Sequence, residues 1–180
     1  MTWVKICGIT NRRDAELAAR LGADAIGFVF VPSSPRFVQP REVRAIARDL
    51  DVMTVGVFQD QDEDTVRRIA NDSGVSTIQL HGKETPDFCA SFDRPIIKAF
   101  RGPVATGYRA FAILADGAAS WPTLRGLERG IIAGGLTPAN VRAAVRAEKP
   151  FGVDLASGVE ASPGKKDEDA MKRFFEQVRS

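Results

Sequence analysis

The sequence predicts an α/β fold, a (βα)8 TIM barrel that forms a single domain over residues 1–180 and is trimmed around its fifth and sixth βα units. Eight short apolar runs of strand length follow one another along the chain, and amphipathic segments separate most of them. Such alternation is typical of parallel βαβ units. Glycine turns end the last two runs, as in many barrels. An open doubly wound sheet is the alternative, but no Gly-x-Gly-x-x-Gly turn follows the first run.

The expected strands are nearly continuous apolar runs, which suits a sheet buried on both faces. They span residues 4–7, 25–30, 53–58, 77–80, 95–99, 111–115, 131–133 and 152–155. Helices are expected at residues 14–21, 40–51, 62–72 and 167–179. The first follows a capping Asn11 or Thr10, the second opens with Pro40, and the third opens with an acidic turn. The last places Met171 and Phe175 on one apolar face.

Two connections are short for a full barrel. Residues 101–110 separate the fifth strand from the sixth, and a crossover with its helix needs about 10–12 residues or more. The fifth helix is therefore expected to have one or two turns or to be absent. Residues 116–129 form a second short connection, and 180 residues lie below the usual barrel length of about 200.

Composition excludes several classes of function. The formal net charge is +2 with basic and acidic residues interspersed, so no nucleic-acid partner is expected. The sequence has no signal-peptide core and no apolar run of membrane-spanning length, so we expect a cytoplasmic protein with no membrane partner. Cys7 and Cys89 are then expected to be reduced thiols. With a single histidine and no Cys/His cluster, no metal site is expected.

The active site of such a barrel lies at the carboxyl ends of its strands, a rule that selects Cys7 and Asp116. Cys7 ends the first strand and Asp116 ends the sixth. The pair could perform acid–base chemistry, provided that burial raises the carboxyl pKa and a positive charge lowers the thiol pKa. The plainer alternatives are a small apolar core residue for Cys7 and a helix cap or turn residue for Asp116.

Three further side chains are candidates for binding a substrate. Arg36 lies on a proline-stiffened loop after the second strand, where a rigid guanidinium suits bidentate capture of a carboxylate. His81 follows the fourth strand and is either a substrate contact or a structurally hydrogen-bonded histidine. Asp154 lies in the eighth strand and is selected by the same strand-end rule.

The two glycine turns predict a phosphate site. Gly134 and Gly135 follow the seventh strand, and Ser157 and Gly158 follow the eighth. Glycines let backbone N–H groups approach a ligand closely, and the loops after strands seven and eight often bind phosphate in barrels.

Several motifs, in order, resemble one known family. They are KICGIT at 5–10, GFVF at 27–30 with SPR at 34–36, VGVF at 55–58, QLHG at 79–82, AGGL at 133–136, and the stretch 153–167. Together these residues resemble phosphoribosylanthranilate isomerase of tryptophan biosynthesis. The resemblance runs from end to end apart from residues 101–129.

The resemblance implies an intramolecular oxidoreductase of the aldose–ketose isomerase type. Its reaction is the acid–base catalysed Amadori rearrangement of N-(5-phosphoribosyl)anthranilate to 1-(2-carboxyphenylamino)-1-deoxyribulose 5-phosphate. Cys7 falls on the family's general base, Asp116 on its general acid, and Arg36 on the residue that holds the anthranilate carboxylate. The two glycine turns match the phosphate cradle. A small phosphoribosyl substrate, no cofactor, and a monomer rather than a homodimer are expected.

Two alternatives stay open on the sequence. The chain could isomerise a related N-glycosyl ribose phosphate, or it could be a catalytically impaired phosphosugar-binding barrel. The second arises because the loop at residues 117–121 is shorter than the family's loop, which closes over substrate, and a raised KM is expected. The retention of Cys7 and Asp116 argues against a barrel without turnover.

Overall fold

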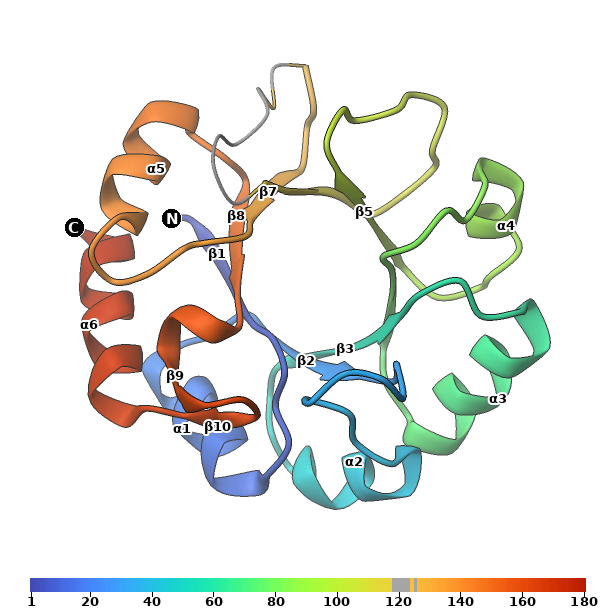
Figure 1. Ribbon diagram of the computed structural model, residues 1–180, viewed down its shortest axis with the longest axis horizontal. Helices are drawn as coiled ribbons and strands as arrows, with labels where there is room; N and C mark the ends of the chain where they lie inside the picture. The colour runs from blue at the N-terminus through green and yellow to red at the C-terminus, as the bar shows by residue number, and fades with distance from the viewer. Residues whose placement is uncertain (118–123, 125) are drawn as a thin grey trace.

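Eight parallel strands form a closed barrel in chain order, and β8 pairs with β1 to complete it (Figure 1). The computed structural model describes residues 1–117, 124 and 126–180. The strands are β1 (Trp3–Ile6), β2 (Ala25–Val29), β3 (Met53–Phe58), β4 (Thr77–Leu80), β5 (Ile96–Arg101), β6 (Ala112–Asp116), β7 (Gly130–Ala133) and β8 (Gly152–Leu155). The predicted barrel is confirmed, and its closure excludes the open sheet.

The helices lie outside the barrel and leave one side thinly covered (Figure 1). They are α1 (Arg12–Leu21), α2 (Pro40–Ile46), α3 (Glu63–Ser73), α4 (Pro86–Ala90), α5 (Val141–Glu148) and α6 (Glu168–Arg179). Residues 102–111, between β5 and β6, contain no helix, and neither do the described residues 117, 124 and 126–129 between β6 and β7. The absence of a helix from residues 102–111 agrees with the trimming expected around the fifth unit, and the trimming of the sixth unit stays a prediction.

The second helix ends earlier than the sequence predicts. It was expected over residues 40–51, but α2 ends at Ile46, with Ala47 as its last capping residue. Asp49 takes the left-handed conformation, with φ of 58°, which cannot continue a right-handed helix. None of the described helices is both long and apolar enough to cross a membrane.

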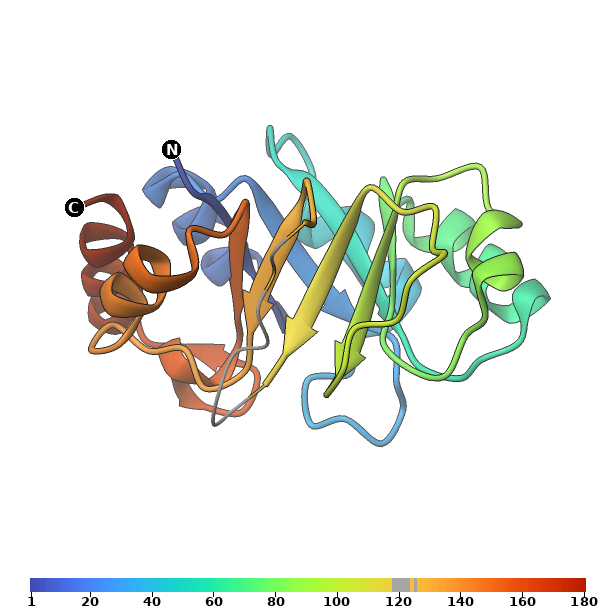
Figure 2. The ribbon, with the colours of Figure 1, turned by 90° about the horizontal axis from the view of Figure 1, so that it is seen from above.

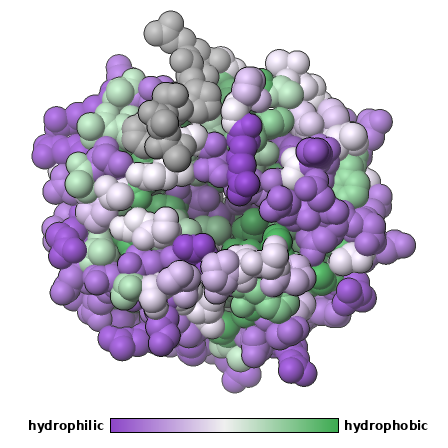
Figure 3. Space-filling model, in the orientation of Figure 1, coloured by the Kyte–Doolittle hydropathy of each residue, from purple (hydrophilic) through white to green (hydrophobic). Residues whose placement is uncertain are grey.

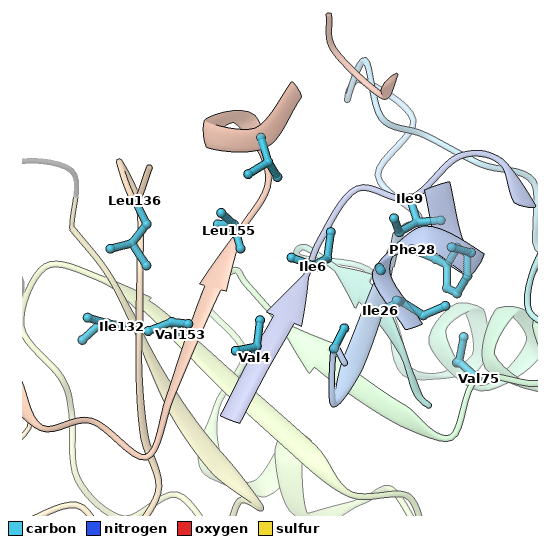
Figure 4. Close-up of a cluster of buried hydrophobic side chains, with 14 of the residues drawn as sticks. Val4, Ile6, Ile9, Ile26, Phe28, Val75, Ile132, Leu136, Val153 and Leu155 are labelled. Atoms are coloured by element: carbon cyan, nitrogen blue, oxygen red, sulfur yellow. The ribbon is translucent and has the colours of Figure 1, made fainter. Parts of the chain in front are cut away.

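Side chains alternate between two environments along each strand. Val4 and Ile6 of β1, Ile132 of β7 and Val153 and Leu155 of β8 belong to the core between barrel and helices (Figure 4). The intervening residues point into the barrel, because successive strand residues face opposite sides. A second apolar cluster therefore fills the barrel interior, with members that include Ala25, Val55, Ile97, Leu114 and Ile131.

All eight strands run in the same direction, so their carboxyl ends open on one face, the lower side in Figure 2. The loop at residues 31–38 and a small antiparallel hairpin also lie on this face. The hairpin consists of β9 (Glu160–Ser162) and β10 (Lys165–Lys166). It follows a single 3-10 turn, Ser157–Val159, and was not expected from the sequence.

Candidate active site

A cavity of about 500 Å³ opens at the carboxyl ends of the barrel strands. The space-filling view down this end of the barrel shows a hollow near its centre, where hydrophilic and hydrophobic residues meet (Figure 3). The lining includes every site residue that the sequence predicts, namely Cys7, Arg36, His81, Asp116, Gly134, Gly135, Asp154, Ser157 and Gly158. The fold thus brings together residues that lie up to 151 positions apart in the sequence, from Cys7 to Gly158.

Cys7 is held at the end of β1 with its side chain facing the cavity. Its backbone N–H donates to the carbonyl of Leu155 on the neighbouring strand at 2.8 Å. The adjacent β2 has a glycine where the thiol needs space, since a Cβ on Gly27 would lie 2.9 Å from the Cys7 Sγ. The residue is 9% exposed and borders the cavity.

A buried ion pair lies directly below Cys7. Lys5, one inward-facing position earlier on β1, is fully buried and donates from Nζ to Asp154 Oδ1 at 2.9 Å. Burial disfavours the charged form of Lys5, but the Asp154 carboxylate raises the pKa of Lys5 above its ordinary value. The sequence analysis did not find Lys5, because a lysine within an apolar run gives no sign of where its ammonium ends.

Asp116, the candidate acid, receives two hydrogen bonds at the end of β6. His81 Nε2 lies 3.2 Å from Asp116 Oδ2, and Arg101 Nε donates to the same oxygen at 3.4 Å. On the other side of the imidazole, Gln79 Nε2 lies 3.2 Å from His81 Nδ1. With Gln79 donating to Nδ1, His81 carries its proton on Nε2 and donates it to the carboxylate.

The pKa shifts of the acid–base pair are opposite to those that the sequence analysis required. The hydrogen bond from His81 lowers the pKa of Asp116, and this outweighs burial. Burial raises the pKa of Cys7, and the opposing effect of Lys5 is smaller. Neutral pH therefore favours a carboxylate at Asp116 and a thiol at Cys7. The acid–base chemistry expected from the sequence would require the same single proton to move, so that Asp116 is protonated and Cys7 is ionised.

Arg36 reaches the cavity edge but is already paired. Its Nε donates to Glu160 Oε1 at 2.9 Å and its Nη2 donates to Glu160 Oε2 at 2.6 Å. Glu160 also accepts a hydrogen bond from Lys166 Nζ at 2.8 Å. The sequence places Arg36 correctly at the barrel mouth but gives no sign of this carboxylate, which lies 124 residues further along the chain.

The two glycine turns predicted to bind phosphate lie against each other. Gly134 and Gly135 have φ values of 80° and 67°, in the left-handed region that favours glycine. Gly158, in the turn after β8, packs so closely on the first turn that a Cβ there would collide with the Leu136 carbonyl oxygen. Side chains are therefore excluded from the contact, and both backbones border the cavity.

The prediction of no metal site is not contradicted by the described residues, among which no group of three or more His, Cys, Asp or Glu side chains could hold a metal ion. The expectation of a shortened loop at residues 117–121 falls on positions that, beyond Gly117, lie outside the described residues.

The fold and the site together define a (βα)8-barrel enzyme whose strand ends carry a thiol, a carboxylate and a guanidinium beside two glycine-containing backbone turns. The model of the N-(5′-phosphoribosyl)anthranilate isomerase family matches residues 4–177. The chain belongs to this family.

Individual relatives agree with the family match. The isomerase of Pelobacter propionicus is 42% identical, and the match covers 97% of this chain and 94% of that protein. A crystal structure of monomers generated from the dimeric isomerase of Thermotoga maritima superposes with a TM-score of 0.92, at 38% identity over 100% of both chains. A further isomerase structure has a TM-score of 0.91, at 38% identity over 99% of both chains. That protein is in complex with reduced 1-(o-carboxyphenylamino)-1-deoxyribulose 5-phosphate.

Proposed function

We propose that the protein converts N-(5-phosphoribosyl)anthranilate to 1-(2-carboxyphenylamino)-1-deoxyribulose 5-phosphate. The reaction moves hydrogen within one molecule, which makes the enzyme an aldose–ketose isomerase. One observation carries the proposal beyond family membership: Cys7, Asp116, Arg36 and the two glycine turns border the same cavity. A base, an acid, a carboxylate receptor and a phosphate cradle are the four parts that this substrate needs.

Ring opening is the first step, and Asp116 supplies its proton. A protonated Asp116 donates to the furanose ring oxygen, the bond from that oxygen to C1′ breaks, and the nitrogen lone pair forms an iminium ion. The ring oxygen becomes a hydroxyl, and Asp116 becomes the carboxylate that its hydrogen bond from His81 stabilises. His81 thus holds the acid in place and solvates its charged form.

Proton removal at C2′ follows, and Cys7 is the base. The positive iminium nitrogen acidifies the C2′ proton, so the Cys7 thiolate can remove it to give an enolamine. The enolamine gains a proton at C1′ and loses its enol proton to become the ketone. Of the two protons released, one from C2′ and one from the enol, one adds to C1′ as its second hydrogen and the other restores protonated Asp116, while Cys7 returns to the thiolate. No net proton is consumed.

The remaining site residues bind the parts of the substrate that do not react. The N–H groups of the turns at Gly134–Gly135 and Ser157–Gly158 receive the phosphate, and Arg36 receives the anthranilate carboxylate. Asp154 borders the cavity beside Cys7 and accepts a substrate hydroxyl with the oxygen that Lys5 does not engage. The chemistry needs no cofactor, because the substrate nitrogen stabilises the intermediate.

The proposal also covers the domain organisation, the oligomeric state and the cellular setting of the protein. We expect residues 1–180 to act as a single-domain monomer, because one chain provides all the groups assigned above, although a relative from Thermotoga maritima is described as dimeric. Two free, buried cysteines support a reducing, cytoplasmic setting.

The direct test is turnover of synthetic phosphoribosylanthranilate by the purified protein, followed chromatographically as loss of substrate and formation of product. We expect turnover that is absent from the Cys7→Ala variant. Turnover of a phosphoribosyl amine with a different aglycone, but not of the anthranilate compound, would assign the barrel to a related isomerisation. Tight binding of the substrate with no turnover would identify a phosphosugar-binding barrel instead.

The reversed pKa values predict an unusual pH dependence. We expect kcat/KM to be flat within about twofold from pH 7 to 8.5, a range above the second phosphate ionisation near pH 6. At higher pH, in the raised range where Cys7 ionises, kcat/KM should fall, because no proton is then left for Asp116. Between about pH 7 and 8.5, Cys7 and Asp116 together hold one proton. The transfer of this proton from Cys7 to Asp116 does not depend on pH, so the rate should not either.

Steady-state rates across this range test the assignment. A tenfold rise with each pH unit would mean that the thiolate alone limits the reaction and that Asp116 donates no proton. A rate that falls between about pH 7 and 8, where histidines ordinarily finish titrating, would assign the acid role to an imidazolium.

A further inference from the structure

Glu160 of the β9–β10 hairpin lies directly behind Arg36 and fixes the plane of its guanidinium. The two side chains form parallel hydrogen bonds of 2.9 and 2.6 Å, from Nε and Nη2 to the two carboxylate oxygens. The Glu160 side chain is 4% exposed and that of Arg36 is 22% exposed, so the carboxylate is inside and the guanidinium borders the cavity. A bidentate pair of this kind fixes orientation as well as distance.

The pairing leaves one edge of the guanidinium available. Glu160 occupies the edge formed by Nε and Nη2, and Nη1 makes no hydrogen bond to the part of the chain that the structure describes. The N–H fork of arginine has a rigid planar geometry, so fixing one edge also fixes the direction of the other. The second edge, formed by Nη1 and Nη2, can accept another planar carboxylate in two hydrogen bonds.

Lys166 holds Glu160 in turn. Its fully buried ammonium donates to Glu160 Oε1 at 2.8 Å and to the carbonyls of Cys7 at 2.6 Å and Ala156 at 3.2 Å. Burial disfavours the carboxylate, but hydrogen bonds from Arg36 and Lys166 lower the pKa of Glu160 below its ordinary value. Two cations around one carboxylate leave a net positive charge, so Arg36 keeps its attraction for an anion.

The hairpin and the Arg36 stem are anchored next to the proposed base. The aliphatic part of Arg36 crosses Gly8, the residue after Cys7, where a Cβ would lie 2.5 Å from Arg36 Cδ. The backbone N–H of Lys166 donates to Asp14 Oδ2 of α1 at 2.9 Å. Because its neighbours are fixed in this way, Glu160 cannot move without releasing Arg36.

We propose that Glu160, locked by Lys166, is a specificity-determining positioning residue that aims the free edge of Arg36 at the carboxylate of the substrate's aromatic amine. Glu160 acts through Arg36 and does not itself touch the substrate. The inference rests on the proposed function, in which Arg36 binds that carboxylate.

Two ligands that differ by one carboxylate test the inference. They are the product, 1-(2-carboxyphenylamino)-1-deoxyribulose 5-phosphate, and its analogue with an unsubstituted phenyl ring. Calorimetry of each ligand gives a carboxylate advantage, the ratio of the two dissociation constants. We expect Glu160→Gln to reduce this advantage by about tenfold, the scale of a lost charged hydrogen bond, with little change in binding of the phenyl analogue. Glu160→Asp keeps the charge but is too short to make both bonds, and should behave similarly.

The direction in which the carboxylate advantage changes distinguishes a positioning role of Glu160 from a purely electrostatic one. Glu160→Gln removes a negative charge near the site, so a purely electrostatic role would increase the carboxylate advantage, which would overturn the proposal. Glu168→Gln removes an equal charge from an exposed ion pair on α6 and should leave the advantage unchanged. Thermal unfolding of each variant verifies that the barrel is folded.

A double-mutant comparison completes the test. Arg36→Met should abolish most of the carboxylate advantage, and adding Glu160→Gln should change it no further, because a positioning residue has nothing left to position. If Arg36→Met reduces the advantage but neither Glu160 variant does, the inference fails and the proposed function survives. If Arg36→Met leaves the advantage unchanged, the carboxylate binds elsewhere and both the role of Arg36 and the inference are wrong.

Discussion

The Cys7→Ala variant is expected to lose isomerase activity by about 10²–10⁴-fold or more, because removal of a positioned base eliminates proton abstraction at C2′. Alanine keeps the β1 backbone and its bond to Leu155, and it deletes one small side-chain atom beside the cavity. The barrel should therefore unfold at nearly the wild-type temperature. Steady-state turnover with phosphoribosylanthranilate, together with thermal unfolding, measures both effects.

Cys89→Ala is the matched control for this variant. Cys89 is a buried thiol of α4, it does not border the cavity, and burial raises its pKa to about 11. The control should keep wild-type turnover and lose some stability, because it leaves a small void in the packed core. Near-wild-type activity in Cys7→Ala would mean that another group, with Asp154 the nearest carboxylate to consider, removes the C2′ proton.

The sequence predicted the barrel well because its strands are buried on both faces. Each expected strand overlaps the observed one, and their ends differ by at most two residues, as at β5, which was expected over 95–99 and spans Ile96–Arg101. Helix ends were harder to predict. The turn at Asp49 that ends α2 depends on a local left-handed conformation, which cannot be predicted from the presence of an aspartate alone.

The strand-end rule found the residues that border the cavity but not those beneath them. Cys7, Asp116 and the glycine turns are visible because each follows an apolar run directly. Lys5 and Glu160 act through partners 149 and 124 residues away, and only barrel closure brings those partners together. The same reason explains why the sequence did not give the direction of the Asp116 pKa shift, because that direction depends on His81 at the end of β4.

Two of the polar networks at the barrel mouth are each centred on a carboxylate that interacts with side chains from other strands or loops. On one side, His81 and Arg101 contact Asp116, the group proposed to gain and lose a proton, and Gln79 contacts His81 from behind. On the other side, Arg36 and Lys166 surround Glu160, which stays ionised. Partly exposed donors around Asp116 can adjust as its charge changes, whereas the fully buried Lys166 keeps Glu160 charged. Burial thus distinguishes Asp116, the carboxylate proposed to titrate, from Glu160, the carboxylate proposed to position Arg36.

Asp116→Asn is expected to lose isomerase activity by about 10²–10⁴-fold or more, since an amide cannot protonate the ring oxygen. The substitution conserves shape, and the carbonyl oxygen of the introduced amide can still accept the hydrogen bond from His81 Nε2. Binding of the product, which has no ring to open, should therefore change little. Turnover assays and product calorimetry on the same variant separate the chemical loss from a loss of binding.

The pH dependence of the residual activity makes this prediction specific. In the proposed mechanism of the wild-type enzyme, Cys7 and Asp116 share one proton, so its rate is expected to be flat near neutral pH. Without Asp116, the thiolate of Cys7 alone should limit the reaction, so the residual rate should rise about tenfold per pH unit toward the raised pKa of Cys7. Arg101→Met removes the more exposed partner of Asp116 and, as the control, should stay active with a flat profile. Substantial activity in Asp116→Asn with an unchanged flat profile would show that another donor, with His81 the nearest, opens the ring.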